Sequence, residues 1–217
     1  MLEQAGNQRM DTDSRQEQIA RAALRLAENG LRAVTVTAVA EAVGLVPSAL
    51  YRHFRNRNEI LRAAFGQLHS MLRANLEASS AEQDPLVGLE RFWRRHLGLI
   101  RENGAVPRIL FSEEIAAPGS PFREMLIEAQ NGMISGIAAI LARGQRDNAI
   151  RDDVDPRDLT MLFLGQILLS AHMFFIRRGD FELEAQVERS WVIFREMLAP
   201  RALHEEKYPC ECIRTNV

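Results

Sequence analysis

Cysteine is scarce in this 217-residue chain: its two thiols, Cys210 and Cys212, stand one residue apart near the C-terminal end. That spacing fits neither a disulfide framework nor a four-ligand zinc site. The chain also has no P-loop, no dinucleotide fingerprint, no metal-spaced cluster of histidine and cysteine, and no nucleophile motif. We therefore expect no enzyme activity, no catalytic residues, no cofactor and no metal.

Signals for strands and for membrane insertion are missing or weak as well. No strand-like alternation of useful length and no internal repeat occurs. Residues 1–13 are polar and unlike a signal peptide, so we expect a disordered N-terminal tail and a cytoplasmic protein. The most apolar run, residues 159–176, touches the lower length limit for a membrane span, but Gln166, Ser170 and His172 interrupt it. We expect a helix buried in protein and no membrane partner.

Charge is unevenly distributed along the chain. Hydrophobic residues make up 47% and charged residues 26%, which is ordinary for a globular chain with a real core. The net charge is −2, yet residues 15–62 carry eight arginines against four glutamates, and residues 63–217 are net acidic. A basic head on an acidic body is typical of a DNA-binding module joined to another unit, although a mild surplus is also common by chance.

Apolar residues recur at helical spacing along the chain, which predicts an all-α fold of about nine helices. Ser14 followed by Glu17 forms a capping box for the first helix, and Asn29-Gly30 ends it. Further helices are predicted at residues 36–43, 47–54, 57–78, 86–101, 107–117, 122–146, 157–177 and 182–198.

Residues 35–61, TVTAVAEAVGLVPSALYRHFRNRNEIL, predict two short helices joined by a tight turn. Ala40 is small enough for close helix packing, and Gly44 can take the left-handed conformation that ends a helix. Leu50 is the apolar residue that would anchor the second helix, whose N-terminal half could then enter the DNA major groove. An ordinary αα-hairpin is the alternative interpretation, because short helix-turn-helix patterns recur by accident.

The segment from Arg15 to Phe65 contains the patterns I-x-x-A-A-x-x-L from Ile19, T-V-x-x-V-A from Thr35, A-V-G-L at 42–45, and A-L-Y-R-H-F at 49–54 followed by R-N-R-N-E-I-L. With these patterns the segment resembles the N-terminal domain of TetR-family transcriptional regulators. One departure is Val46, where family members often carry a Ser or Thr that caps the recognition helix. The rest of the chain is similar to the family only in length and helix count.

The resemblance implies a set of DNA contacts in the helix-turn-helix segment. Tyr51 can pack on a thymine methyl group and reach a phosphate, and Arg52 can read guanine or hold a phosphate. Arg57 would combine its guanidinium with the positive end of the fourth helix as a phosphate clamp. The complete predicted set is Thr35, Thr37, Pro47, Ser48, Ala49, Tyr51, Arg52, His53 and Arg57.

The resemblance also implies a small-molecule pocket among the middle helices. Methionine and aromatic residues at helical spacing are more often core, so Trp93 and Phe163 are expected to be core in any case. His96 and Gln166 are more informative, because a buried polar group needs a partner. The predicted lining set is Trp93, His96, Phe111, Glu114, Met125, Gln130, Met133, Phe163 and Gln166.

The last two predicted helices carry more apolar surface than one core can bury. A two-helix face that pairs with its own copy gives a four-helix bundle and an isologous dimer interface. The predicted interface residues are Leu162, Leu169, Met173, Trp191 and Phe194.

These observations predict a regulator built from two functional parts. We expect a helix-turn-helix domain at 14–56 with a connecting helix at 57–78, a helical ligand-binding and dimerisation domain at 79–200, and a flexible tail at 201–217. The chain would act as a homodimeric repressor on a palindromic double-stranded operator, released by an unidentified small apolar or amphipathic effector. The alternative is an all-helical adaptor module, which would show no salt-dependent DNA binding.

Overall fold

The computed structural model describes residues 12–177 and 180–200, and those residues form an all-helical protein without strands, which confirms the predicted fold class. Almost all of the predicted N-terminal tail and the whole C-terminal tail, with Cys210 and Cys212, lie outside the described residues. The helices are α1 Thr12–Ala27, η1 (3₁₀) Leu31–Ala33, α2 Val36–Ala42, α3 Pro47–Leu50, α4 Arg57–Ser80, α5 Pro85–Glu102, α6 Ala105–Leu110, α7 Glu113–Ala116, α8 Arg123–Arg146, α9 Pro156–Arg177 and α10 Leu183–Leu198.

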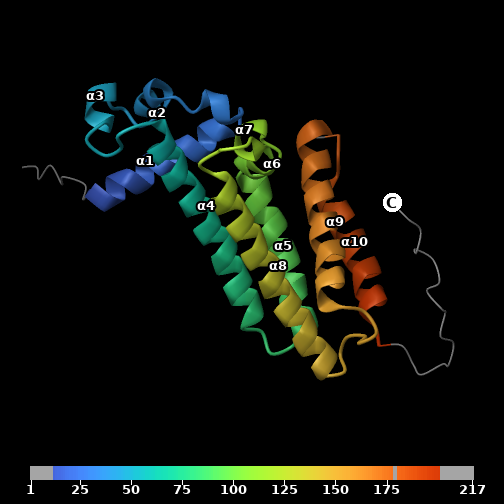
Figure 1. The fold of residues 1–217 in the computed structure, drawn as a ribbon. Coiled ribbons are helices and arrows are strands. Elements are labelled where there is room, and N and C mark those ends of the chain that lie inside the picture. The colour runs from blue at the N-terminus through green and yellow to red at the C-terminus, as the bar shows by residue number, and fades with distance from the viewer. Residues whose placement is uncertain (1–11, 178–179, 201–217) are drawn as a thin grey trace, which may run out of the picture.

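Helices α1, α2 and α3 form a small head at one end of the molecule (Figure 1). The buried face of α1, with Ile19, Ala22 and Ala23, packs against α4 and α2. Helix α1 begins at Thr12, two residues before the predicted capping box. The carboxylate of Glu17 instead pairs with Arg21 one turn later, at 3.0 Å, so it does not cap the helix.

Helix α4 connects the head to the larger helical body. It begins at Arg57 and is capped by Asn56, whose side chain accepts a hydrogen bond from the backbone N–H of Glu59 at 3.0 Å. Its first two turns bury Ile60 and Leu61, and later turns bury Phe65 and Leu68. At 1.5 Å per residue these 24 residues span about 36 Å. One rigid element therefore contributes to both parts of the molecule.

The body is a bundle in which α4, α5 and α8 lie side by side, and α9 and α10 pair on the side away from α4 (Figure 1). Gly88 of α5 sits where a Cβ atom would lie only 2.6 Å from the backbone oxygen of Ser79, so α4 and α5 are in close contact there. The helix predicted at 107–117 is two shorter ones, α6 and α7, because Ser112 between them is extended at ψ 122°.

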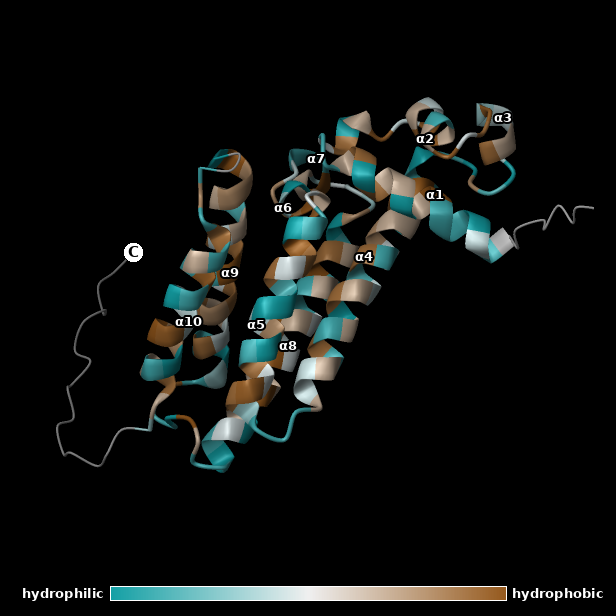
Figure 2. Cartoon of the chain, turned by 180° about the vertical axis from the view of Figure 1, so that it is seen from behind, coloured by the Kyte–Doolittle hydropathy of each residue, from teal (hydrophilic) through white to brown (hydrophobic). Residues whose placement is uncertain are grey.

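Two helices of the described part of the chain, α8 and α9, are by length and composition able to cross a membrane. Such helices also occur in the cores of soluble proteins, and here α9 packs against α8, α5 and α10. Phe163, Ile167 and Ala171 line the buried face of α9, as expected for a helix packed in protein. Other faces of α9 also carry apolar residues. In Figure 2 the brown colour of hydrophobic residues recurs along both α9 and α10.

Candidate nucleic-acid interface and body cavity

A tight turn separates α2 from α3 and sets their relative position. Thr35 begins α2 by accepting a hydrogen bond from the backbone N–H of Ala38 at 3.1 Å. Gly44 adopts φ 68°, a left-handed conformation that glycine takes without Cβ strain. The N–H of Leu45 then donates to the carbonyl of Ala40 at 2.9 Å, which satisfies a carbonyl that the helix end would leave unpaired. The predicted turn therefore forms as expected.

Helix α3 is shorter than predicted. It comprises one turn, Pro47–Leu50, with Pro47 at the first helical position and no side-chain cap from Val46. Leu50 is fully buried and anchors the turn to the head. Beyond it the chain continues as turns, in which the N–H groups of Arg52 and His53 donate to the carbonyls of Ala49 and Leu50 at 3.2 and 2.9 Å.

Helix α3 and the turns that follow it carry exposed polar and aromatic side chains. Tyr51 is 52% exposed, and Arg52 is exposed with no ion pair or hydrogen bond from its guanidinium to any described residue. His53 is half-buried. Of the other predicted DNA contacts, Thr35, Thr37, Pro47 and Ser48 are exposed and Ala49 is half-buried.

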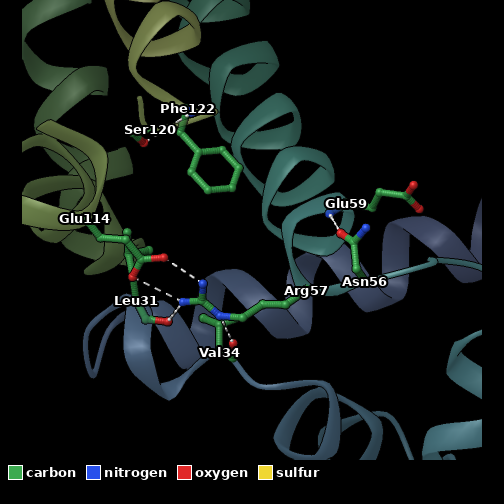
Figure 3. A network of polar contacts seen from close by, with 8 residues as sticks. All are labelled: Leu31, Val34, Asn56, Arg57, Glu59, Glu114, Ser120 and Phe122. Atoms are coloured by element: carbon green, nitrogen blue, oxygen red, sulfur yellow. Dashed lines mark hydrogen bonds and ion pairs between the residues drawn. The ribbon is translucent and has the colours of Figure 1, made fainter. Parts of the chain in front are cut away.

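Arg57 differs from the prediction, because its guanidinium is already engaged by the protein (Figure 3). Its Nε donates to the carbonyl of Val34 at 2.7 Å, and its Nη2 donates to the carbonyl of Leu31 at 2.6 Å. Its Nη1 forms an ion pair with Glu114 of α7 at 2.6 Å, and the arginine side chain is 29% exposed. We therefore correct its role from phosphate clamp to a link between α4, the η1 segment and α7.

The body contains a cavity of about 590 Å³ between α4, α5, α6, α7, α8 and α9. That volume lies in the range of small-molecule sites in proteins. Most side chains around it are leucine, isoleucine, methionine or phenylalanine. The polar lining residues His69, Glu128, Gln130 and Asn131 are exposed, whereas His96 is buried. The cavity is thus apolar inside, with one enclosed polar side chain.

His96 is unusual among the lining residues in being both polar and enclosed. Its ring stacks on Phe92 of the same helix, with centroids 4.7 Å apart and planes inclined by 22°. Burial without a compensating charge lowers the pKa of His96 from 6.5 to about 4. The imidazole is therefore neutral at pH 7.

Family comparisons match both parts of the chain. Residues 19–64 match the model described as bacterial regulatory proteins of the tetR family, and residues 85–175 match the tetracyclin repressor-like C-terminal domain. The head and most of the body are thereby covered.

The chain belongs to the TetR family.

Individual relatives agree with that placement. The chain is 27% identical over 176 residues to the transcriptional regulator TcmR of Streptomyces glaucescens, covering 78% of this chain and 76% of TcmR. It is 28% identical over 147 residues to the repressor KstR2 of Rhodococcus jostii, covering 62% and 66%. The fold is similar to that of FadR from Bacillus subtilis in complex with stearoyl-CoA, with a TM-score of 0.69, 19% identity, and coverage of 83% and 98%. TetR-family proteins are DNA-binding transcriptional regulators and not enzymes.

Five of the predicted lining residues reach the cavity of this TetR-family body, and four do not. The five are His96, Phe111, Met125, Gln130 and Met133. Trp93 and Phe163 are fully buried and in mutual contact, with ring centroids 5.1 Å apart, so they belong to the core. Glu114 is occupied by Arg57, and Gln166 is not among the lining residues. The prediction is wrong for these four.

Several lining residues were not predicted from the sequence. Phe65, Leu68 and Leu72 of α4, and Leu164 and Leu168 of α9, face the cavity. Their sequence pattern is the one that produces any helix core, because the same residues at the same spacing would face a filled interior. Only the packing of the six helices shows that a void lies between them.

The outer face of α9 and α10 carries exposed apolar side chains. Leu162 is 51% and Leu169 62% exposed and Met173 is half-buried, and their place in a dimer interface stays a prediction. Trp191 and Phe194 are instead 4% and 0% exposed, so the chain itself covers them, and their assignment to a dimer surface is wrong. The exposed large apolar residues of α10 are Val192 and Ile193, at 53% and 65%.

Proposed function

We propose that this chain is a cytoplasmic, homodimeric transcriptional repressor that binds a palindromic operator and is released by a small, mainly apolar effector. The observation that carries the proposal is the exposed surface of α3 and of the turn that follows it. Leu50 holds α3 against the head, while Tyr51 and Arg52 in the following turn stay exposed, and the guanidinium of Arg52 pairs with no described residue. Tyrosine and arginine at such a position can contact base edges and phosphates in the major groove.

A dimer would contact more base pairs than one head can. Helix α3 is a single turn, so one copy can read only a few base pairs. The exposed apolar side chains of α9 and α10 support an isologous pairing, in which the same face of two copies meets across a two-fold axis. Two heads related in this way would read a palindrome, with half-sites on successive turns of the duplex.

Release by an effector is supported by the route from the cavity to the head. Phe65, Leu68 and Leu72 of α4 line the cavity, and the same helix begins at Arg57 beside the head. Ile115 of α7 also lines the cavity, next to the Glu114 that holds Arg57. A ligand that favours a different placement of α4 would therefore change the separation of two heads, with a coupling free energy of about 1–3 kcal/mol.

The proposed effector is apolar because the interior of the cavity is apolar. The similar fold of FadR was determined with stearoyl-CoA bound, which supports a body of this architecture that receives an apolar group. The alternative function, an adaptor module without DNA binding, is not favoured, because TetR-family members are DNA-binding regulators.

DNA binding can be measured by fluorescence anisotropy with the duplex upstream of the coding region, at several salt concentrations. Tyr51→Ala and Arg52→Ala should each cost about 1–3 kcal/mol of specific binding, roughly 5- to 150-fold in Kd. Arg146→Ala, an exposed arginine at the far end of α8, is the matched control and should bind like the wild type. Wild-type affinity in the Tyr51, Arg52 double mutant, or a flat dependence on salt, would contradict the proposal and favour the adaptor.

A further inference from the structure

The inner wall of the cavity has one polar group whose hydrogen-bonding capacity is unused. His96 of α5 lines the cavity and is 8% exposed. Neither ring nitrogen has a hydrogen-bond partner among the described residues, and because Nδ1 is fully enclosed, a molecule in the cavity would reach the ring through Nε2. Buried polar atoms are nearly always paired in folded proteins, so such a group in a cavity wall points to a partner that arrives from outside the chain.

The partner should be able to pair with a neutral imidazole. Enclosure holds the pKa of His96 at about 4, so at pH 7 the ring offers one N–H donor and one lone pair. A hydroxyl group can use either site, and a keto oxygen can accept from the N–H. The stacked contact with Phe92 fixes the ring plane, which limits the directions from which such an oxygen can approach.

The charge of the cavity argues against an anionic group at this place. No lysine or arginine is among the described residues that line it, and the one charged side chain, Glu128, is exposed and acidic. A carboxylate beside His96 would lose its hydration without gaining a cationic partner, which is strongly unfavourable in an apolar site. An uncharged oxygen meets no such penalty.

We propose that the cavity takes an uncharged, mainly apolar molecule bearing one hydroxyl or keto oxygen, which hydrogen-bonds to His96 at the inner wall. The proposal rests on the proposed function, in which a ligand of this cavity releases DNA, and names the chemical class of that ligand. The apolar part of the molecule lies against the leucine, methionine and phenylalanine side chains. The hydrogen bond to His96 favours this class over hydrocarbons, and the lack of a charge favours it over carboxylates.

Three probes of similar shape separate these classes: 2-naphthol, 2-methylnaphthalene and 2-naphthoate. Each competes with the uncharged dye Nile red, whose fluorescence reports occupancy of the cavity in the full chain. The readout is the ratio of the affinity for 2-naphthol to the affinity for 2-methylnaphthalene. Comparing this ratio between protein variants cancels the different hydration of the two probes, so the change in the ratio reports the hydrogen bond alone.

His96→Phe removes the hydrogen bond but keeps a ring that can stack on Phe92. The affinity ratio should fall about fivefold to tenfold in this variant, as expected for the loss of one enclosed hydrogen bond. The same substitution at the exposed lining histidine, His69→Phe, is the control and should leave the ratio unchanged. The wild type should bind 2-naphthoate at least tenfold more weakly than 2-naphthol.

An unchanged ratio in His96→Phe would overturn the proposal. So would 2-naphthoate binding as tightly as 2-naphthol, which would indicate an anionic ligand, or failure of Nile red and every probe to bind. Should His96→Phe not fold, the wild-type comparison of naphthol with naphthoate decides, together with the ratio in His96→Gln, which keeps a hydrogen-bonding group. The assay contains no DNA, so its result is separate from the test of operator binding.

Discussion

Replacing Glu114 with glutamine removes one charge from the link between body and head and leaves the shape of the side chain. The Glu114 carboxylate contacts the guanidinium of Arg57 through both oxygens, at 2.6 and 3.3 Å. The two side chains are 36% and 29% exposed, so water screens the pair in part. Partly exposed ion pairs contribute up to about 1 kcal/mol, and we expect Glu114→Gln to lower the free energy of unfolding by about 0.5–1 kcal/mol.

For a chain of this length that loss corresponds to about 1–4 °C in Tm. Arg57→Ala should cost more, about 2–3 kcal/mol, because the carbonyl of Val34 also loses the donor at 2.7 Å. Calorimetry or circular dichroism at one fixed protein concentration measures both, since association of copies would otherwise shift Tm.

The control is Glu113→Gln, the exposed neighbour on α7, which should change Tm by less than about 1 °C, as surface substitutions usually do. In the Arg57→Ala background, Glu114→Gln should have almost no further effect, because its partner is already gone. The reasoning is refuted if Glu114→Gln behaves like Glu113→Gln, or if the effects at Arg57 and Glu114 simply add.

Three further outcomes are expected. Leu169→Asp, on the exposed apolar face of α9, should convert dimers to monomers in analytical ultracentrifugation, while Gln83→Glu in the α4–α5 loop should not; identical sedimentation of the two would contradict the interface. Gly88→Ala should lower the urea midpoint of unfolding, since its Cβ would lie 2.6 Å from the Ser79 carbonyl oxygen. In the control Gly66→Ala the new Cβ meets nothing within 4 Å, so the free energy of unfolding should rise by about 0.5–1 kcal/mol. The depressed pKa of His96 favours the neutral ring in the folded state, so the free energy of unfolding decreases as pH falls from 6.5 towards 4. Between pH 7.5 and 5 the free energy of unfolding of the wild type should fall by about 2 kcal/mol more than that of His96→Phe. Equal losses in the two proteins would count against an enclosed ring.

The helix-turn-helix could be predicted because its determinants are local. Gly44, Pro47 and Leu50 lie within seven residues of one another, and each acts through its own backbone conformation or burial. Arg57 could not be placed in the same way. The carbonyls and carboxylate that bind it are 23, 26 and 57 residues away in the sequence. Its position at the start of a helix indicates an anionic partner. Only the fold shows that the carboxylate of Glu114 is this partner.

Helix α10 shows a second limit of sequence-based prediction, namely which side of a helix faces the core. Trp191, Val192, Ile193 and Phe194 are four consecutive apolar residues, so the sequence leaves open which of them face outward. The interpretation that places the aromatic pair at the interface is wrong. In the fold Val187, Trp191, Phe194 and Leu198 share the buried face, and Val192 and Ile193 remain exposed. The sequence predicts only part of the cavity lining for a related reason, since a void is a property of packed helices and cannot be recognised in the sequence of any one of them.

The position of α4 has a consequence for how the chain unfolds. Its buried side chains belong to one continuous hydrophobic cluster that extends from Ile19 in the head to Leu198 at the end of α10. A fragment that stopped at Asn56 would lack Ile60, Leu61 and Ala64, all fully buried, and would expose the apolar face of α1 to water. The region that recognises DNA is therefore a functional unit without being an autonomous folding unit, and heat or denaturant should melt it together with the rest of the protein in a single cooperative transition.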